Sequence, residues 1–128
     1  MNIVQGSISL DALMKARNQF VHALQVAQSD LEITGTIKCF EYCYELSWKT
    51  MKKILEFYGV QDISSPRKVF VAAYQNNLIT DLELWNSFIE KRNLTAHTYN
   101  SVLAHTIFDS LTIFEEALKE FMLTIEKL

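Results

Sequence analysis

Residues that form tight turns are scarce in this chain, which has three glycines and one proline among 128 residues. A sheet of many strands needs frequent turns, so this scarcity argues against an all-β fold. Hydrophobic residues make up 49% of the chain and charged residues 21%. At this length and composition we expect one domain, spanning residues 1–128, with a single core built from helices.

Long apolar runs and the features of a signal peptide are also missing. No apolar run approaches the roughly 18 residues that a membrane span needs. The first residues, MNIVQGSISLDAL, contain neither the basic start nor the apolar stretch that directs secretion. These absences predict a cytoplasmic protein that does not enter a membrane.

Cysteine is limited to Cys39 and Cys43. Their spacing of four residues suits one face of a helix and matches neither a disulfide framework nor a CxxC redox motif, so we expect buried or half-buried thiols. A zinc site would need two further ligands from His22, His97 and His105. We therefore predict no metal and no cofactor.

Positive charge is limited as well, because the formal net charge is −3. Proteins that coat nucleic acid hold phosphates with many lysines and arginines, so the overall charge argues against that class. The segment from Lys38 to Arg92 nevertheless holds eight lysines and arginines against seven acids. This balance permits a local site for an anionic ligand.

Apolar residues at intervals of three and four predict five helices. The first spans about residues 10–31. Gly35 is predicted to break the pattern, so that the second helix begins after it with Thr34 or Thr36 as the cap. The second helix is predicted to end near Gly59, which suits a C-terminal cap.

The second half of the chain has clear start signals for helices. Pro66 suits the first position of a short third helix. Thr80 and Glu83 fit a capping box, which predicts that a fourth helix begins at Asp81 and runs into the segment EKRNLTAHTYN. A last helix runs from about Val102 to the C-terminus. The predicted fold is all-α, an antiparallel four-to-five-helix up-and-down bundle.

The segment EKRNLTAHTYN, residues 90–100, places polar groups in line with the apolar face of the fourth helix. On a helical wheel one stripe contains Trp85, Phe88, Ile89, Arg92, Ala96 and Tyr99. A guanidinium in such a stripe needs a partner or water, because an unpaired buried charge is very costly. The alternative is that the helix leaves the core at Arg92 and its polar residues only face solvent.

The polar residues of this segment suit chemistry on a phosphate. Arg92 offers a cationic fork that matches phosphate oxygens, and His97 can act as acid or base near neutral pH. Asn93 can orient the imidazole, and Tyr99 adds a hydroxyl. We predict Arg92 and His97 as catalytic residues, with Asn93 and Tyr99 binding or orienting, at a site that needs no metal.

Two acids of the second helix, Glu41 and Glu45, are candidates for a supporting role. They are one helical turn apart and would tune His97 if they faced the motif. The alternative interpretation is a solvated face, which is the commoner role of acids at this spacing.

The residues RNLTAHTY resemble the Rx4-6H motif of the HEPN superfamily of small all-helical domains, in the Arg-Asn-x-x-x-His-x-Tyr form of its HepT-like members. Upstream, FEYCYELSWKTMKKILEFYG and SPRKVFVAAYQNNLI resemble the branch described as nucleotidyltransferase substrate-binding proteins. The likeness covers about Ile37 to Asn100. It implies a homodimer in which Arg92 and His97 of both chains line one cleft.

The resemblance also implies partners and activities. Members of this superfamily pair with a separately encoded minimal nucleotidyltransferase, and many are metal-independent ribonucleases. In HepT-like toxins the partner silences the ribonuclease by transferring AMP to the motif tyrosine, here Tyr99.

Three functions follow as hypotheses. The first is a partner subunit that presents nucleotide or substrate to a minimal nucleotidyltransferase, which the acidic net charge favours. The alternative is the metal-independent RNase of a toxin–antitoxin pair, acting on RNA and neutralised at Tyr99, which the intact motif favours. The third is a structural dimer whose motif only satisfies the interface.

Overall fold

The structure is a computed structural model that describes residues 8–128; residues 1–7, part of the segment that argues against a signal peptide, lie outside the described residues. Every regular element in the described range is a helix. The elements are α2 (Asp11–Val26), α3 (Asp30–Phe57), α4 (Pro66–Gln75), α5 (Leu82–Leu94), the short 3-10 helix η1 (Thr95–His97), α6 (Ser101–Asp109) and α7 (Leu111–Ile125). None of these helices has the length and apolar content needed to cross a membrane.

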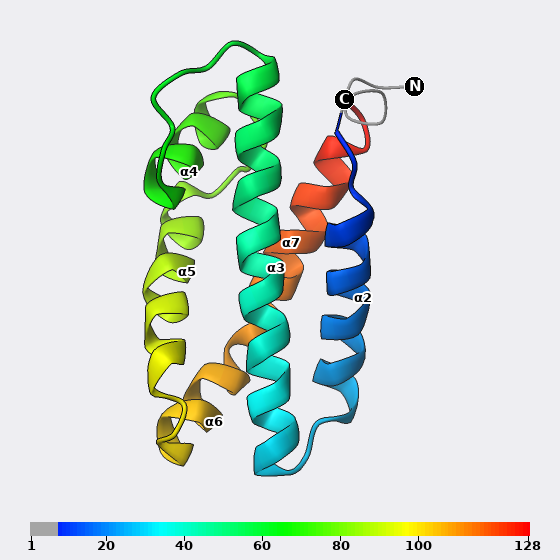
Figure 1. The fold of residues 1–128 in the computed structure, drawn as a ribbon, viewed down its shortest axis with the longest axis vertical. Coiled ribbons are helices and arrows are strands. Elements are labelled where there is room, and N and C mark those ends of the chain that lie inside the picture. Colours follow the sequence, from blue (N-terminus) through cyan, green and yellow to red (C-terminus); the bar gives the residue numbers. More distant parts are fainter. Residues whose placement is uncertain (1–7) are drawn as a thin grey trace.

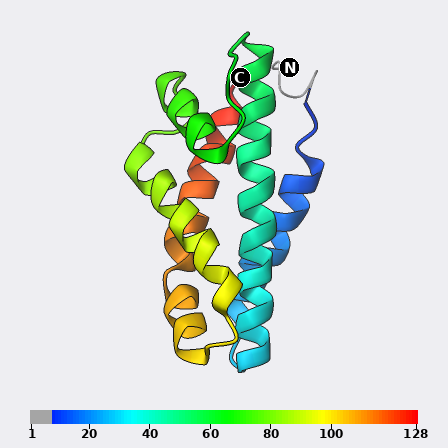
Figure 2. The same cartoon turned by 60° about the vertical axis from the view of Figure 1, so that its left-hand side comes forward.

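The helices form an antiparallel bundle (Figures 1 and 2). In the view of Figure 1, α2 runs downward, α3 returns upward, α5 runs downward, and α6 with α7 returns upward. The short α4 packs against α3 and α5 at the end of the bundle where α3 ends. This arrangement confirms the predicted all-α, up-and-down bundle.

Aromatic rings from several helices meet in the centre of the bundle. Phe114 of α7 makes edge-to-face contacts with Phe40 of α3, Phe88 of α5 and Phe20 of α2, at centroid distances of 4.8, 5.0 and 5.9 Å. All four side chains are fully buried. Such contacts add specific geometry to the burial of apolar area, so these rings fix how the helices pack.

The boundary between the first two helices differs from the prediction. Ser29 and Glu32 form a capping box: the Ser29 hydroxyl accepts from the Glu32 N–H at 3.1 Å, and the Glu32 carboxylate accepts from the Ser29 N–H at 2.9 Å. The predicted break at Gly35 is wrong, because this glycine lies inside α3 and neither flanking threonine is a cap. The capping box satisfies two backbone N–H groups at the start of α3. This stabilises the helix more than the single glycine at position 35 destabilises it.

The third helix follows its sequence signals. Pro66 is its first residue, and Ser65 caps it by accepting from the Lys68 N–H at 3.3 Å. Asn77, just past the end, has the left-handed φ of 62° that asparagine tolerates. The predicted start at Pro66 is confirmed.

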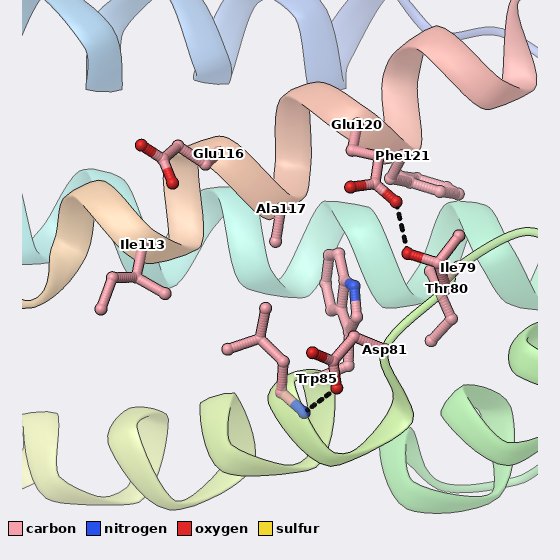
Figure 3. A pocket seen from close by; sticks show the side chains of 10 residues that line it. Ile79, Thr80, Asp81, Trp85, Ile113, Glu116, Ala117, Glu120 and Phe121 are labelled. Atoms are coloured by element: carbon pink, nitrogen blue, oxygen red, sulfur yellow. Dashed lines mark hydrogen bonds between the residues drawn. The ribbon is translucent and has the colours of Figure 1, made fainter.

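The fourth helix begins one residue later than predicted. Its cap is Asp81, whose carboxylate accepts from the Leu84 N–H at 2.9 Å, so Thr80 and Glu83 do not form the predicted capping box. The Thr80 hydroxyl donates instead to Glu120 of α7 at 2.5 Å. The side chain of Thr80, which the local sequence pattern predicts as the cap, is bonded instead to a residue of another helix (Figure 3).

The predicted last helix is two helices, α6 and α7, separated at Ser110. The Ser110 hydroxyl donates to the Ile107 carbonyl at 2.7 Å and accepts from Lys91 Nζ at 2.5 Å. Burial lowers the pKa of Lys91. A serine that bonds to the backbone of the preceding turn favours a helix end, and Lys91 holds this break against α5.

Candidate functional site

The predicted motif lies where α5 ends. α5 stops at Leu94, η1 carries His97, and a turn carries Tyr99. The prediction that one helical stripe continues to Tyr99 is therefore wrong. The reason is Thr95, whose buried hydroxyl accepts from Arg92 Nη1 at 2.9 Å and donates to the Arg92 carbonyl at 2.6 Å. This local bonding competes with continuation of the helix.

The Arg92 guanidinium lies beside two carboxylates of α3. Its Nη1 is 3.9 Å from Glu41 Oε1, and its Nε is 3.9 Å from Glu45 Oε1. Lys38 Nζ donates to the other oxygen of Glu41, and Trp48 Nε1 to the other oxygen of Glu45, both at 3.1 Å. An arginine in line with an apolar stripe is thus compensated by two fixed negative charges.

The compensation leaves hydrogen-bonding capacity on Arg92. Its Nε is buried and has no hydrogen-bond acceptor within the described residues. The side chain as a whole is 35% exposed. An anion that reached the exposed part of this guanidinium would meet its positive charge, whereas Nε lies out of reach.

His97 and Tyr99 form a second part of the site. The Tyr99 hydroxyl is 3.5 Å from His97 Nδ1, and the two rings stand edge to face with centroids 5.9 Å apart. Both residues are exposed, and Tyr99 is 85% exposed. The imidazole and the phenol can therefore reach a partner molecule.

Two predicted supporting roles have a different geometry in the structure. Glu41 and Glu45 face Arg92, and the contacts of these two carboxylates do not include His97. Asn93 is exposed, and no hydrogen bond joins it to His97 in residues 8–128. The imidazole contacts Tyr99 instead.

The sequence interpretation gave no role at the site to Thr95 or Trp48. Thr95 is buried and holds the guanidinium of Arg92, while the indole of Trp48 fixes the carboxylate of Glu45. An i, i+3 relation links each pair, Arg92 to Thr95 and Glu45 to Trp48. That spacing is a signal in the sequence that predicts contact on a helix.

A buried tyrosine lies next to this cluster. Desolvation of Tyr44, reinforced by the Glu45 carboxylate, raises the pKa of its hydroxyl to about 12, although the charge of Arg92 acts in the opposite direction. Tyr44 therefore stays protonated at neutral pH, and the charges beside Arg92 are those of the carboxylates.

A hollow of about 350 Å³ adjoins Tyr99, between the start of α3 and the start of α6. Leu31 lines it and is 82% exposed. On another side His105 Nε2 is 2.9 Å from Asp30 Oδ1. The hollow places an apolar side chain and a polar pair next to the exposed phenol.

Residues 8–127 match the model of the family described as "Nucleotidyltransferase substrate binding protein like". The chain belongs to this family. A relative from Haemophilus influenzae, named probable ribonuclease HepT, is 32% identical over 108 residues, which cover 77% of this chain and 69% of the relative. The resemblance to HepT-like and nucleotidyltransferase substrate-binding proteins is thereby confirmed.

Solved structures agree with this family assignment. A protein of Thermus thermophilus superposes with a TM-score of 0.79 at 27% identity, covering 86% of this chain and 95% of its own. A Haemophilus influenzae protein, described as revealing the fold of a substrate binding domain of a nucleotidyltransferase, superposes with a TM-score of 0.81 at 25% identity. That match covers 92% of this chain and 99% of the other. The helical bundle is thus the fold of a nucleotidyltransferase substrate-binding domain.

Proposed function

We propose that this chain is the substrate-binding partner subunit of a minimal nucleotidyltransferase encoded nearby. It works as a homodimer whose α5–η1 ends face each other. The observation that carries the proposal is an exposed apolar cluster beside His97, in which Tyr99 is 85%, Leu31 82% and Val102 75% exposed. Leu31 and Tyr99 line one hollow, and Val102 lies in the first turn of α6. Exposed apolar clusters of this kind mark protein interfaces.

The dimer brings the charged groups of both chains to one cleft. Arg92 supplies a half-exposed guanidinium, which binds phosphate oxygens as a fork. His97 lies a short distance along the chain on η1 and is exposed. Two copies of this pair suit a nucleotide or another phosphate-bearing substrate held for the nucleotidyltransferase.

Sedimentation of matched variants tests the interface. The parent is expected to be a dimer at micromolar concentration, and Val102→Asp to be a monomer because a charge is placed in the apolar contact. Phe57→Asp is the control, since Phe57 is 52% exposed and is the last residue of α3, whereas Leu31 of the apolar cluster lies in the first turn of this helix. A monomeric parent, or equal effects of the two variants, would contradict the interface.

Co-purification tests the partner. The chain, expressed with the minimal nucleotidyltransferase from the neighbouring reading frame, is expected to elute with it as one complex. The Val102→Asp variant reports whether that complex needs the dimer. Separate elution of the two parent proteins would refute the proposed function.

A second function, a metal-independent RNase, is favoured by the partly exposed guanidinium of Arg92 together with the exposed imidazole of His97. His97 would take the proton of a ribose 2′-hydroxyl, whose oxygen attacks the adjacent phosphorus while the 5′-oxygen leaves and is protonated. Arg92 would stabilise the charge that develops on the phosphate oxygens. A relative named probable ribonuclease HepT supports this candidate.

Cleavage of RNA by the purified protein distinguishes the two functions. For the RNase, His97→Ala and Arg92→Ala should each abolish cleavage while helicity is retained. A chelator should leave cleavage by the parent unchanged. Cleavage by both variants at the parent rate, or its loss with the chelator, would exclude this mechanism.

Tyr99 is the proposed acceptor of AMP in the same system. Its oxygen would attack the α-phosphorus of ATP, forming a phosphodiester to the phenol, with loss of the hydroxyl proton and departure of pyrophosphate. The exposure of Tyr99 makes the hydroxyl accessible, and the added negative charge would lie beside His97, where RNA phosphate must bind. Intact-mass spectrometry of the co-expressed pair should show an adduct on the parent and none on Tyr99→Phe.

A further inference from the structure

The contact between Tyr99 and His97 joins a phenol hydroxyl to a ring nitrogen. A neutral phenol donates through its O–H, whereas a neutral imidazole has one nitrogen that accepts and one that carries the proton. The Tyr99 hydroxyl lies 3.5 Å from His97 Nδ1. Catalytic hydrogen bonds are often this long before a substrate binds and tighten when it does. The tautomer that suits the contact has a free lone pair on Nδ1 and its proton on Nε2.

The other ring nitrogen of His97 is not bound to the protein. Nε2 makes no hydrogen bond and no ion pair in residues 8–128, and the residue is exposed. A proton taken up at Nδ1 would turn the ring into an imidazolium, whose Nε2 proton could then pass to water. The imidazole is therefore placed to carry a proton from the hydroxyl to solvent.

The other basic groups near the site are engaged elsewhere. The hollow beside Tyr99 also contains His105, but its Nε2 is 2.9 Å from Asp30 Oδ1. The carboxylates of Glu41 and Glu45 lie beside Arg92. Within the described part of the chain, the contacts of the Tyr99 hydroxyl include no carboxylate. His97 is thus the group of this chain that is positioned to accept its proton.

We propose that His97 is the general base for nucleotide transfer to Tyr99, an inference that rests on the proposed role of Tyr99 as AMP acceptor. The phenol O–H bond breaks and its proton moves to Nδ1, while the phenol oxygen forms a bond to the α-phosphorus of ATP. The bond from that phosphorus to the oxygen shared with the β-phosphorus breaks, and pyrophosphate leaves. The imidazolium then releases its Nε2 proton to water.

A base beside the hydroxyl matters because a phenol that keeps its proton is a weak nucleophile, and an adjacent general base activates it. The same imidazole is the proton acceptor of the RNase candidate. A chain that has lost this histidine would therefore be a poor acceptor of AMP as well as an inactive ribonuclease. Modification would act most readily on chains whose site is intact.

Initial rates of modification test the role of His97 in the full chain. The chain is incubated with the nucleotidyltransferase from the neighbouring reading frame, ATP and magnesium, and the adduct is followed by intact-mass spectrometry. His97→Gln keeps an acceptor for the hydroxyl but cannot take its proton, so it should lower the rate about 10²-fold. His22→Gln is the control, because it removes an exposed imidazole of α2 that does not contact Tyr99.

Chemical rescue separates proton transfer from a structural role. Free imidazole should restore modification of His97→Ala, and substituted imidazoles of higher pKa should restore it faster, as general base catalysis requires. The Tyr99→Phe variant should gain no adduct under the same conditions. Circular dichroism should show that His97→Ala and His97→Gln keep the helicity of the parent.

A reagent that needs no partner protein tests the activation of the phenol by itself. A fluorophosphonate carries an electrophilic phosphorus, from which a phenol oxygen displaces fluoride while it loses its proton. Tyr74 is the internal standard, since it is 48% exposed and has no contact with an imidazole in residues 8–128. The ratio of labelling at Tyr99 to labelling at Tyr74 should fall at least about tenfold in His97→Gln.

The two measurements can fail separately. Equal rates of AMP transfer to the parent and His97→Gln would overturn the proposal and leave Tyr99 as the acceptor. A slow His97→Ala variant that imidazole does not restore would also overturn it, since His97 would then only position the phenol. No adduct on the parent would refute the acceptor role itself, and the labelling ratio would then decide whether His97 activates the phenol.

Discussion

The two carboxylates beside Arg92 are predicted to stabilise the protein jointly, so that losing both costs more than the sum of the single losses. The perturbations are Glu41→Gln, Glu45→Gln and the pair together. Each replacement keeps the side-chain shape and removes one negative charge. Arg92→Gln then supplies the background in which the guanidinium is absent.

The expected magnitudes follow from distance and exposure. Each pair is 3.9 Å apart, where the attraction near a protein surface is about 4 kcal/mol before opposing costs. Measured exposed pairs retain about 0.2–1 kcal/mol, and Arg92 is 35% exposed, so each single replacement should lower the free energy of unfolding by about 0.5–1 kcal/mol. With both carboxylates gone, the buried Nε has no counter-charge, and the loss should reach about 2–3 kcal/mol, below that of a fully buried pair.

Urea unfolding followed by helical circular dichroism measures these free energies. Glu56→Gln is the matched control, because Glu56 is exposed on the same helix and has no ion pair in the described residues. In the Arg92→Gln background the double replacement should cost clearly less than in the parent, because only the pairs of Glu41 with Lys38 and of Glu45 with Lys49 remain to be lost. A double variant as stable as the parent, or an equal loss with and without Arg92, would refute the reasoning.

Three further predictions concern the fold. Gly35→Ala should raise the free energy of unfolding by about 0.5–1 kcal/mol, because this helical glycine has open space around it. Gly59→Ala should lower the free energy of unfolding by about 1 kcal/mol, because Gly59 has a φ of 88°. Thermal unfolding compares the two variants. Phe114→Ala should cost about 3–5 kcal/mol, against about 0.5 kcal/mol for the half-exposed Phe57→Ala, in urea unfolding. Burial raises the pKa of the Cys43 thiol to about 12. Above the usual thiol pKa the unfolded chain has therefore lost the thiol proton while the folded chain still holds it, so the free energy of unfolding falls as pH rises. Cys43→Ala should flatten this decline at alkaline pH, and an unchanged dependence of stability on pH would exclude the thiol as its cause.

The helices that the sequence predicts well are those whose signals are local and uncontested. Pro66 and Ser65 start α4 because the missing amide hydrogen and the serine oxygen both suit a first turn. Phe88 lies in the core as its place on the apolar stripe predicts. The start of α5 is harder to predict, since Thr80 and Asp81 are both good caps and the choice between them depends on Glu120 of another helix.

The breaks inside long apolar patterns are harder still to predict. Ser110 interrupts a run of apolar residues at intervals of three and four, and periodicity alone carries no sign of this. Its hydroxyl bonds to Ile107 and accepts from Lys91, which is distant in sequence. The break therefore depends partly on a tertiary contact, which a single pattern cannot contain.

For the site, the sequence indicated which residues gather but not how they are arranged. The set Arg92, His97 and Tyr99 does lie at one end of the bundle, and both acids of α3 do face the motif helix. The wheel assumed an unbroken α-helix, so it placed Tyr99 on the stripe of Arg92. That Glu41 and Glu45 pair with Arg92 follows only from the packing of α3 against α5, which the sequence does not show.

The end of α5 decides which groups of the site can meet. Two residues that are two positions apart in an α-helix point to opposite sides, so His97 and Tyr99 would not touch if the helix continued. Thr95 bonds to Arg92 instead of leaving the backbone free for another turn, and the chain tightens into η1 and then turns. That turn brings the phenol to 3.5 Å from the imidazole. The same threonine thus holds the guanidinium and creates the pairing of the other two groups, which is why the site depends on a helix end rather than on a helix face.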